Sequence, residues 1–506
     1  MPETFLHGVE VVEINDGPRP IRTVRSSVIG IVGTAPNSQP EVKASLLIGT
    51  VGSNNALTIT SKLTGALGNK SSLKLVDPAA NSATLAITVS GRDVVASLAT
   101  NSSGAITTTA AQLKTAIEAN TAANALIGLA NTGASTGAGA VAALKRTALS
   151  GGIDEAFPLN TPVLVAGDQA QAALLGSTGT LPQAMDDIFD QTGAVVVVVR
   201  VAVGEDDDAT LTNVIGGVDV GTGAYEGVHA LLGSESVNGF CPRILVAPGF
   251  TADFGPDDTA NPVVAEMVGI AERLRACIVK DGPNTTDADA IADRGMWGSK
   301  RVYIVDPGVK IRNSLGEIVD QASSARVAGL IAKTDNERGF WWSPSNNVIN
   351  GIVGTGRDID FTLGDANCRA NLLNEQEVAT IIRQDGFRLW GNRTCSDDPK
   401  WAFLSVVRTA DMINDSILRA HMWAVDRNIT RTYLEDVAQG VNDYLDRLKA
   451  QGAILGGRCF PSPGLNTPSS IADGKVFFDF EFTPPYPAEH VTFRSKLVND
   501  YIEEIL

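Results

Sequence analysis

The sequence predicts a multidomain protein that combines α/β and α+β folds, and three observations support this. The chain has 506 residues, which is too long for one hydrophobic core and suggests about three domains. Its middle third alternates short β-branched runs with helical patterns. Its last quarter has two amphipathic helical patterns followed by alternating, strand-like segments. We therefore expect an α/β core domain, a mainly β inserted domain, and a C-terminal α+β domain with extended terminal strand arms.

The first strand pattern lies near the start of the chain. Residues 8–14 alternate apolar and polar side chains and slip by one position between Val11 and Val12, which indicates a β-bulge. The Asp-Gly-Pro sequence at 16–18 predicts a turn. Residues 25–33 form a short apolar run that ends in glycine, as expected for a buried strand.

The composition changes between about residues 36 and 150, where charge becomes sparse and Ala, Ser, Thr, Gly and Asn dominate. Short alternating runs predict strands at residues 57–59, 73–75, 85–89 and 94–98. One helix is expected at about 110–120. Because strand-like sequence resumes at 156–167, we expect a mainly β module inserted into a surface loop between two strands of one domain.

The middle third predicts a largely parallel sheet. The expected strands are residues 194–203, 243–247, 277–279 and 301–305. The first of these is an almost unbroken β-branched run, as in strands buried on both faces. Asn261-Pro262 is expected to cap one intervening helix, and Thr286 to begin another. Strands that alternate with helices indicate right-handed crossovers.

Helical periodicity then spans about 403–425. On this helix one polar stripe is formed by Arg408, Asp411, Asp415 and Arg419. Asp415 and Arg419 are spaced as a favourable i,i+4 pair. A solvated face is the default interpretation of the stripe, and a charged seam against a partner is the alternative.

A second helix is expected to begin at a capping box in residues 432–435 and to end near Gly452, followed by a loop at 456–457. A terminal strand follows at 475–483, with Val476, Phe478, Phe480 and Phe482 on one face. Two prolines end it, and a second alternating run contains Val491, Phe493 and Leu497. Patterned ends of this kind either pair inside their own sheet or add a strand to another copy.

Charge and composition exclude several functions. The formal net charge of -17 disfavours nucleic acid and anionic membranes as partners. There is no signal-peptide pattern and no long apolar run, so we expect the protein to be made in a cytoplasm. The five cysteines have no Cys-x-x-Cys spacing and are expected to be reduced thiols.

No motif points to catalysis. The sequence has no G-x-x-x-x-G-K-[ST] phosphate loop, and the glycine-rich residues 221–227 favour a turn. The loops after the core strands, residues 248–249, 281–283 and 306–308, fit either acidic groups in a crevice or simple turns. The four histidines lack metal-ligand spacing, so no cofactor or metal is expected. Trp341-Trp342 favours an anchor for a loop or an interface over a sugar or base platform.

Several stretches resemble contractile phage tail sheath proteins. They are residues 4–15, 19–21 and 28–35 at the start, 326–332, 340–344, 371–374 and 387–394 in the middle, and 478–485 with 488–491 at the end. The resemblance covers about 1–36 and 156–506 and leaves out the inserted module.

The resemblance implies a sheath of stacked hexameric rings that contracts without nucleotide and drives an inner tube through the host envelope for genome delivery. It implies as partners other copies of the chain, the tail tube protein, and baseplate and tail terminator proteins, in a virion tail assembled in the host cytoplasm. The corresponding domains are an N-terminal arm (1–20), the core (21–36 and 153–380), the inserted peripheral domain (37–152), a tube-facing C-terminal domain (381–490) and a C-terminal arm (491–506).

In this family the arms add strands to sheets of neighbouring subunits. The matching arm residues are Val9, Val11, Ile14, Val491, Phe493 and Leu497. Arg408 and Arg419 are possible tube-facing residues. Two alternatives are a nucleotide-dependent α/β enzyme, and the sheath of a phage-derived bacteriocin or injection machine.

Overall fold

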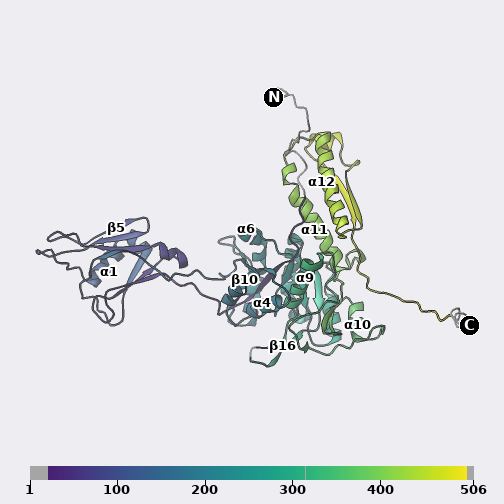
Figure 1. The fold of residues 1–506 in the computed structure, drawn as a ribbon, viewed down its shortest axis with the longest axis horizontal. Coiled ribbons are helices and arrows are strands. Elements are labelled where there is room, and N and C mark those ends of the chain that lie inside the picture. Colours follow the sequence, from purple (N-terminus) through teal and green to yellow (C-terminus); the bar gives the residue numbers. More distant parts are fainter. Residues whose placement is uncertain (1–20, 314, 499–506) are drawn as a thin grey trace, which may run out of the picture. The chain divides into compact units, whose positions relative to one another are not determined.

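The computed structural model describes residues 21–313 and 315–498 and is drawn in Figure 1. The chain forms two compact units. The larger unit combines the residues up to Ala35 with Leu159–Ala172 and Thr178–Leu506, and the insert unit combines Pro36–Pro158 with Ala173–Ser177. The predicted arm residues Val9, Val11 and Ile14 lie outside the described residues.

A six-stranded sheet forms the centre of the larger unit, in the order β15-β14-β13-β1-β10-β9. Its strands are β1 (Val28–Thr34), β9 (Val163–Ala166), β10 (Val195–Val201), β13 (Ile244–Val246), β14 (Cys277–Asp281) and β15 (Val302–Val305). All neighbours pair in parallel except the edge strand β9, which is antiparallel to β10. The predicted largely parallel sheet is therefore confirmed.

Helical elements cover both faces of this sheet. A Cβ atom placed on Gly30 of β1 would lie 3.1 Å from Leu231, whereas one on Gly33 would lie 3.2 Å from Leu181. Leu231 belongs to η3 (Gly227–Gly233) and Leu181 to α4 (Leu181–Phe189). Because residues 30 and 33 point to opposite faces of a strand, the two elements lie on opposite sides.

The other helices around the sheet are α3 (Gln169–Ala172), α5 (Asp207–Ile215), α6 (Ser234–Asn238), α7 (Pro262–Leu274), α8 (Asp287–Gly295) and α9 (Ser324–Arg338). Asn261 accepts a hydrogen bond from Val264 N (3.1 Å), and Thr286 accepts one from Asp289 N (3.1 Å). Both predicted helix starts are therefore confirmed. Helix α9 is buried on almost every side and was not predicted.

Smaller sheets and the last helices follow. The short strands are β11 (Gly217–Val218), β12 (Tyr225–Glu226), β16 (Val309–Arg312), β17 (Ile318–Gln321), β18 (Gly354–Thr355), β19 (Thr380–Arg383) and β20 (Phe387–Trp390). The later helices are α10 (Arg369–Glu375), α11 (Leu404–Ala420), α12 (Arg431–Ala450) and α13 (Pro468–Ala472).

Two boundaries near the end of the chain differ from the prediction. Thr430, not Thr432, caps α12, because its side chain accepts from Tyr433 N. The loop expected at 456–457 is the start of a strand, β21 (Gly456–Pro461), which pairs antiparallel with β22 (Phe478–Thr483). This pairing joins segments separated by about twenty residues, so the Gly-Gly sequence alone suggested only a turn.

The insert unit has two small sheets and its own hydrophobic core. One sheet contains β2 (Ser45–Ile48), β3 (Leu57–Ser61) and β7 (Ile127–Asn131), and the other contains β4 (Ser72–Val76), β5 (Ala86–Ser90), β6 (Asp93–Ser97) and β8 (Leu144–Ala148). Two helices, α1 (Ala110–Ala119) and α2 (Thr121–Leu126), stand where one was expected. Leu113 and Ile117 of α1 are fully buried in this core.

Candidate assembly interface

Helix α11 carries a row of charged side chains that are buried. Arg408 is 4% exposed, and its two terminal nitrogens donate to the two carboxylate oxygens of Asp335 on α9 at 2.6 and 2.5 Å. One of these nitrogens also donates to the carbonyl of Ser26. A paired, fork-like contact of this kind is the strongest type of ion pair in proteins.

Two aspartates on the next two turns of α11 form ion pairs with arginines at the N-terminal ends of strands in the central sheet. Asp411 pairs with Arg301 and Asp415 pairs with Arg243. Arg301 and Arg243 directly precede β15 and β13. Because parallel strands all begin on the same side of a sheet, α11 lies across the N-terminal ends of these strands. Burial raises the pKa of Asp411, and the nearby Arg301 opposes this shift.

The prediction that this stripe is solvated is therefore wrong for three of its four residues. The stripe is a charged seam, but its partners are in the same chain. Arg408 has no exposed guanidinium to offer a tube, so we correct its assignment as a tube-facing residue. Arg419 differs: its side chain is 39% exposed, and it pairs with Asp415 at 2.6 Å, as expected, and with Glu235.

The β21–β22 pair packs on α12. Phe478, Phe480 and Phe482 of β22 contact a cluster that includes Tyr444 and Leu445, and the rings of Phe480 and Phe482 stack 6.3 Å apart. Asp479 and Glu481 point away and are exposed. The predicted alternation of the terminal strand is confirmed for these residues.

The two edges of this small sheet differ. Asn442 of α12 accepts from Cys459 N (2.6 Å) and donates to Cys459 O (2.9 Å), so its amide occupies the outer edge of β21. Ser462 N donates to Phe477 O, and hydrogen bonding alternates along an antiparallel pair. The backbone groups of Phe478, Phe480 and Phe482 therefore face away from β21. In the described part of the chain no third strand joins this edge.

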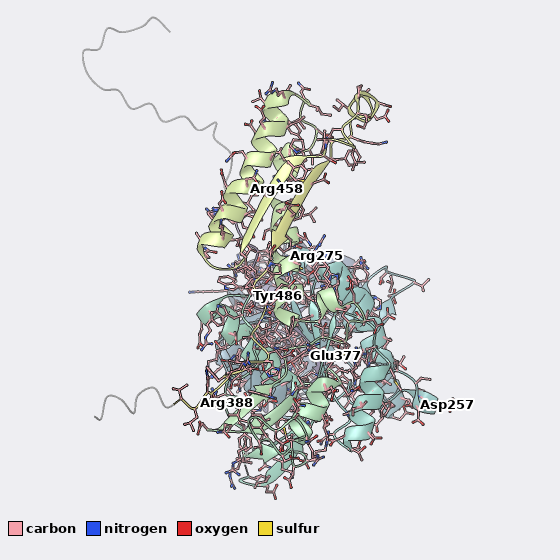
Figure 2. The ribbon with its side chains drawn as sticks, turned by 90° about the vertical axis from the view of Figure 1, so that its right-hand side faces the viewer. Asp257, Arg275, Glu377, Arg388, Arg458 and Tyr486 are labelled. Atoms are coloured by element: carbon pink, nitrogen blue, oxygen red, sulfur yellow. The ribbon has the colours of Figure 1, made fainter. Side chains whose placement is uncertain are left out.

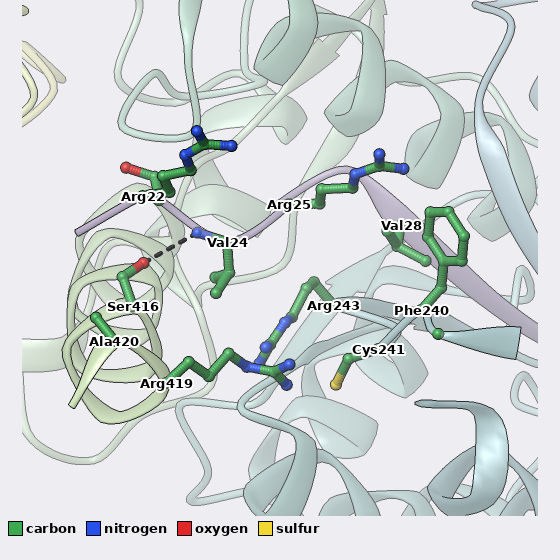
Figure 3. A pocket seen from close by; sticks show the side chains of 12 residues that line it. Arg22, Val24, Arg25, Val28, Phe240, Cys241, Arg243, Ser416, Arg419 and Ala420 are labelled. Atoms are coloured by element: carbon green, nitrogen blue, oxygen red, sulfur yellow. Dashed lines mark hydrogen bonds between the residues drawn. The ribbon is translucent and has the colours of Figure 1, made fainter. Parts of the chain in front are cut away.

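The chain that follows the N-terminal twenty residues is fastened to α11 and α12. Ile21 is 2% exposed, and its carbonyl accepts from Arg447 (2.6 Å). Val24 N donates to Ser416 Oγ at 3.0 Å (Figure 3). The point from which an N-terminal arm would depart is thus held against the same helices that support β21 and β22.

The segment after β22 contacts its own chain at Tyr486 and Glu489 and is exposed beyond them. Tyr486, labelled with Arg458 of β21 in Figure 2, lies 6.1 Å from Phe403 between ring centres. Glu489 pairs with Arg393 at 2.6 Å. Beyond it, Val491, Phe493 and Leu497 are 63%, 91% and 97% exposed, and residues 484–498 form no strand. The described part of the chain therefore leaves these three apolar side chains uncovered.

The acidic loops after the core strands have structural partners. Asp281 accepts from the backbone N–H groups of Ser323 (2.8 Å) and Ser324 (2.7 Å), so it caps the start of α9. Asp306 is buried, pairs with Arg357 and accepts from Asn284 N at 2.8 Å. These contacts favour the turn interpretation over an acidic crevice.

The remaining candidates do not converge on a site. His229 pairs with Glu266 at 2.9 Å, and His421 contacts the carbonyl of Ile417. Within residues 21–313 and 315–498, no group of three or more His, Cys, Asp and Glu side chains is placed to hold a metal ion. Nor is any helix of that part long and apolar enough to span a membrane. Trp342 is 48% exposed beside Arg338, which leaves its interface role a prediction.

Comparison with known proteins identifies the family. The model of the phage tail sheath protein central domain matches residues 223–395, the phage tail sheath C-terminal domain matches 396–497, and the N-terminal region of domain III of tail sheath protein Gp18 matches 146–201. A prophage major tail sheath protein of Pseudomonas aeruginosa (strain UCBPP-PA14) is 45% identical over 348 residues, which cover 69% of this chain and 88% of that protein. The chain belongs to the phage tail sheath family. It is a structural, non-enzymatic subunit of a contractile tail sheath and a component of the virion tail.

Other relatives of this sheath subunit are also tail sheath proteins. The tail sheath protein of Escherichia phage P2 is 36% identical over 70% of this chain and 89% of its own length. The tail sheath protein of Burkholderia phage BcepMu is 28% identical over 99% of this chain and 98% of its own length. The predicted membership of the sheath family is confirmed, and the enzyme alternative is not favoured.

Solved structures share the fold. The helical sheath of the anti-feeding prophage in its contracted state has a TM-score of 0.51 at 20% identity, over 67% of this chain and 88% of that one. The sheath complex of an extracellular contractile injection system (PVC), also contracted, has a TM-score of 0.51 at 17% identity, over 68% of this chain and 89% of that one.

Proposed function

We propose that the subunit polymerises as stacked hexameric rings around a tail tube and that the rings contract to drive the tube through the host envelope. The observation that carries this proposal is the combination of an edge of β22 that no strand within residues 21–313 and 315–498 joins with an exposed, alternating C-terminal segment. The C-terminal segment of one copy can pair with the β22 edge of another copy, and such a head-to-tail contact can repeat to build an open assembly.

The acceptor for a donated strand is the outer edge of β22. The two-stranded sheet already packs on α12 through its phenylalanines, so a third strand would extend a stable sheet. Strand addition would satisfy the outward backbone groups of Phe478, Phe480 and Phe482 and would cover Val491, Phe493 or Leu497 of the donor. The edge of β21 is less suited, because Asn442 already bonds Cys459 and Pro461 has no N–H.

Backbone ladders allow the subunits to stay joined while the rings move. Pro484-Pro485 lies directly after β22 and serves as the hinge of the C-terminal arm. If contraction buries about 200 Å² more apolar surface per subunit, it contributes about 5 kcal/mol for each copy at about 25 cal/mol per Å². Summed over many subunits, this drives the tube without nucleotide.

The other partners follow from the same role. We include among them the tube protein, the baseplate and the tail terminator, and we place assembly in the host cytoplasm. Val9, Val11 and Ile14 would add the strand of the N-terminal arm, and Arg419 is the remaining tube-facing candidate. Its partly exposed guanidinium is tied to Asp415 and Glu235, so a tube contact would have to compete with these carboxylates.

Arm deletion tests the assembly. We expect the full chain to form ordered cylinders in negative-stain micrographs and the chain without residues 1–15 to remain a soluble monomer. The reason is that each ring would lose one of the strands that join it to its neighbours. Long ordered tubes formed by the truncated chain would overturn the proposal.

A single position tests strand addition by the C-terminal arm. Thr492→Pro removes a backbone N–H and restricts the chain, whereas Thr492→Ala at the same position keeps the N–H. We expect cylinders from the alanine variant and few or none from the proline variant. If both variants assemble like the wild type, the segment does not act as a strand.

A further inference from the structure

A cavity of about 500 Å³ lies where residues 22–25 pass over α11 and the segment that precedes β13 (Figure 3). Its size is within the usual range of ligand sites, about 300–1,000 Å³. The apolar part of the wall comes from Val24, Val28, Phe240, Cys241 and Ala420, and the basic part from Arg22, Arg25, Arg243 and Arg419.

The basic side chains are unequally neutralised. Arg243 and Arg419 share Asp415, and Arg419 also pairs with Glu235. Arg22 and Arg25 are exposed and have no carboxylate partner in the part of the chain that the structure describes. The guanidinium of Arg25 lies 4.7 Å above the ring of Phe240. The rim therefore carries two uncompensated positive charges on a chain whose formal charge is -17.

The lining of the cavity fits one kind of ligand. It combines an apolar floor with a positive rim, which together suit a peptide with carboxylates between apolar side chains.

The last eight residues of this chain have that composition. Residues 499–506 read Asn-Asp-Tyr-Ile-Glu-Glu-Ile-Leu, with three carboxylates, no basic side chain and four apolar or aromatic ones. They follow Val491, Phe493 and Leu497, whose exposure shows that the preceding segment is not packed on its own copy.

We propose that residues 499–506 of a second copy bind this cavity. Asp500, Glu503 and Glu504 would pair with Arg22 and Arg25, and an apolar side chain such as Ile502 would enter beside Phe240. The proposal rests on the arm exchange described above and adds its end point. The departure point of one copy's N-terminal arm holds the C-terminal end of another, so both connections are fastened at one place.

Peptide binding tests the cavity without requiring cylinders. A fluorescein-labelled peptide of residues 499–506 is titrated with the full chain, and binding is followed by fluorescence anisotropy. We expect R22E/R25E to weaken binding by about tenfold or more, because two attractive contacts become repulsive. R92E, which reverses an exposed arginine of the insert unit, should bind like the wild type. Equal binding by R22E/R25E and the wild type would overturn the proposal.

Charge reversal on both sides tests the pairing itself. A peptide with Glu503→Arg and Glu504→Arg should bind R22E/R25E more tightly than it binds the wild-type chain. No recovery would contradict the assigned contacts. Both proteins are used at a concentration at which micrographs show no cylinders, so that the ends of other copies do not fill the cavity beforehand and failure of docking is distinguishable from failure of sheath assembly.

A disulfide tests whether the occupant comes from another copy. Cys241 lines the cavity and is partly exposed, whereas the other four cysteines are buried. Ile502→Cys in the full chain, oxidised with diamide, should give reducible dimers and higher oligomers on denaturing gels, and C241S should abolish them. A cross-link within one copy, or none, would overturn docking between copies.

Discussion

Helices α11 and α12 follow each other in the chain and have the same amphipathic periodicity, but the polar face of α11 is buried and that of α12 is exposed to solvent. On α11 the polar side chains Arg408, Asp411 and Asp415 are buried in ion pairs. On α12 the polar face is exposed, and Arg431 has a side chain that is 92% accessible. Periodicity shows which side chains share a face. It does not show whether that face meets water or another part of the fold.

The largest expected effect is at the most buried pair of α11. Arg408→Met leaves the carboxylate of Asp335, whose side chain is 1% exposed, charged and unpaired. We expect a loss of about 3–5 kcal/mol in the free energy of unfolding. Urea unfolding followed by tryptophan fluorescence measures it, because all six tryptophans lie outside the insert unit.

A paired replacement sharpens this result. The double variant Arg408→Met with Asp335→Leu removes both charges and should recover most of the loss. If the free energy of unfolding of Arg408→Met lies within about 1 kcal/mol of the wild-type value, the buried ion pairs of α11 contribute no more than solvated pairs would.

The next effect concerns the edge that α12 protects. Asn442→Ala leaves the N–H and C=O of Cys459, a residue that is 5% exposed, without their amide partner. We expect a loss of about 1–3 kcal/mol by the same urea measurement. Asn442→Asp keeps the acceptor but not the donor and should lie between the alanine variant and the wild type. Equal stability of all three would mean that water replaces the amide.

Buried carboxylates also predict a pH dependence. Burial raises the pKa of Asp187 on α4 to about 7, although Arg326 opposes the shift. Between about pH 4 and pH 7 the folded state therefore binds more protons than the unfolded state, so stability falls as pH rises through this window and levels off above it. Each pKa unit corresponds to about 1.4 kcal/mol, so we expect this group to contribute on the order of 4 kcal/mol across the window, and Asp187→Asn should have a flatter profile of urea midpoints. An identical slope in both proteins would contradict this.

The smallest effect is expected on the exposed face of α12. Arg431 pairs with Glu435 at 2.8 Å, but both side chains are solvated. Arg431→Ala should leave the urea midpoint unchanged within error, since exposed i,i+4 pairs contribute little. A loss comparable to that of Arg408→Met would show that the contrast between the two helices does not govern stability.

Local signals were enough for the parallel sheet and for several helix ends. The β-branched run at 194–203 and the caps Asn261 and Thr286 depend on neighbours within a few residues, and the structure confirms them. Helix α9 was missed because its buried residues include Ser, Thr, Arg and Asp. A helix that is enclosed on almost every side has no polar face to reveal its period.

The amino-acid sequence by itself determined the strand and helix periods, the excess of negative charge, the alternating ends and the resemblance to the sheath family. Only the tertiary structure decided which charges are buried. The pairs Arg408–Asp335 and Arg243–Asp415 join residues 73 and 172 positions apart, and the free energy of an ion pair depends on its surroundings more than on its residue types. The same holds for Asn442, which closes one edge of a sheet through a residue 17 positions away.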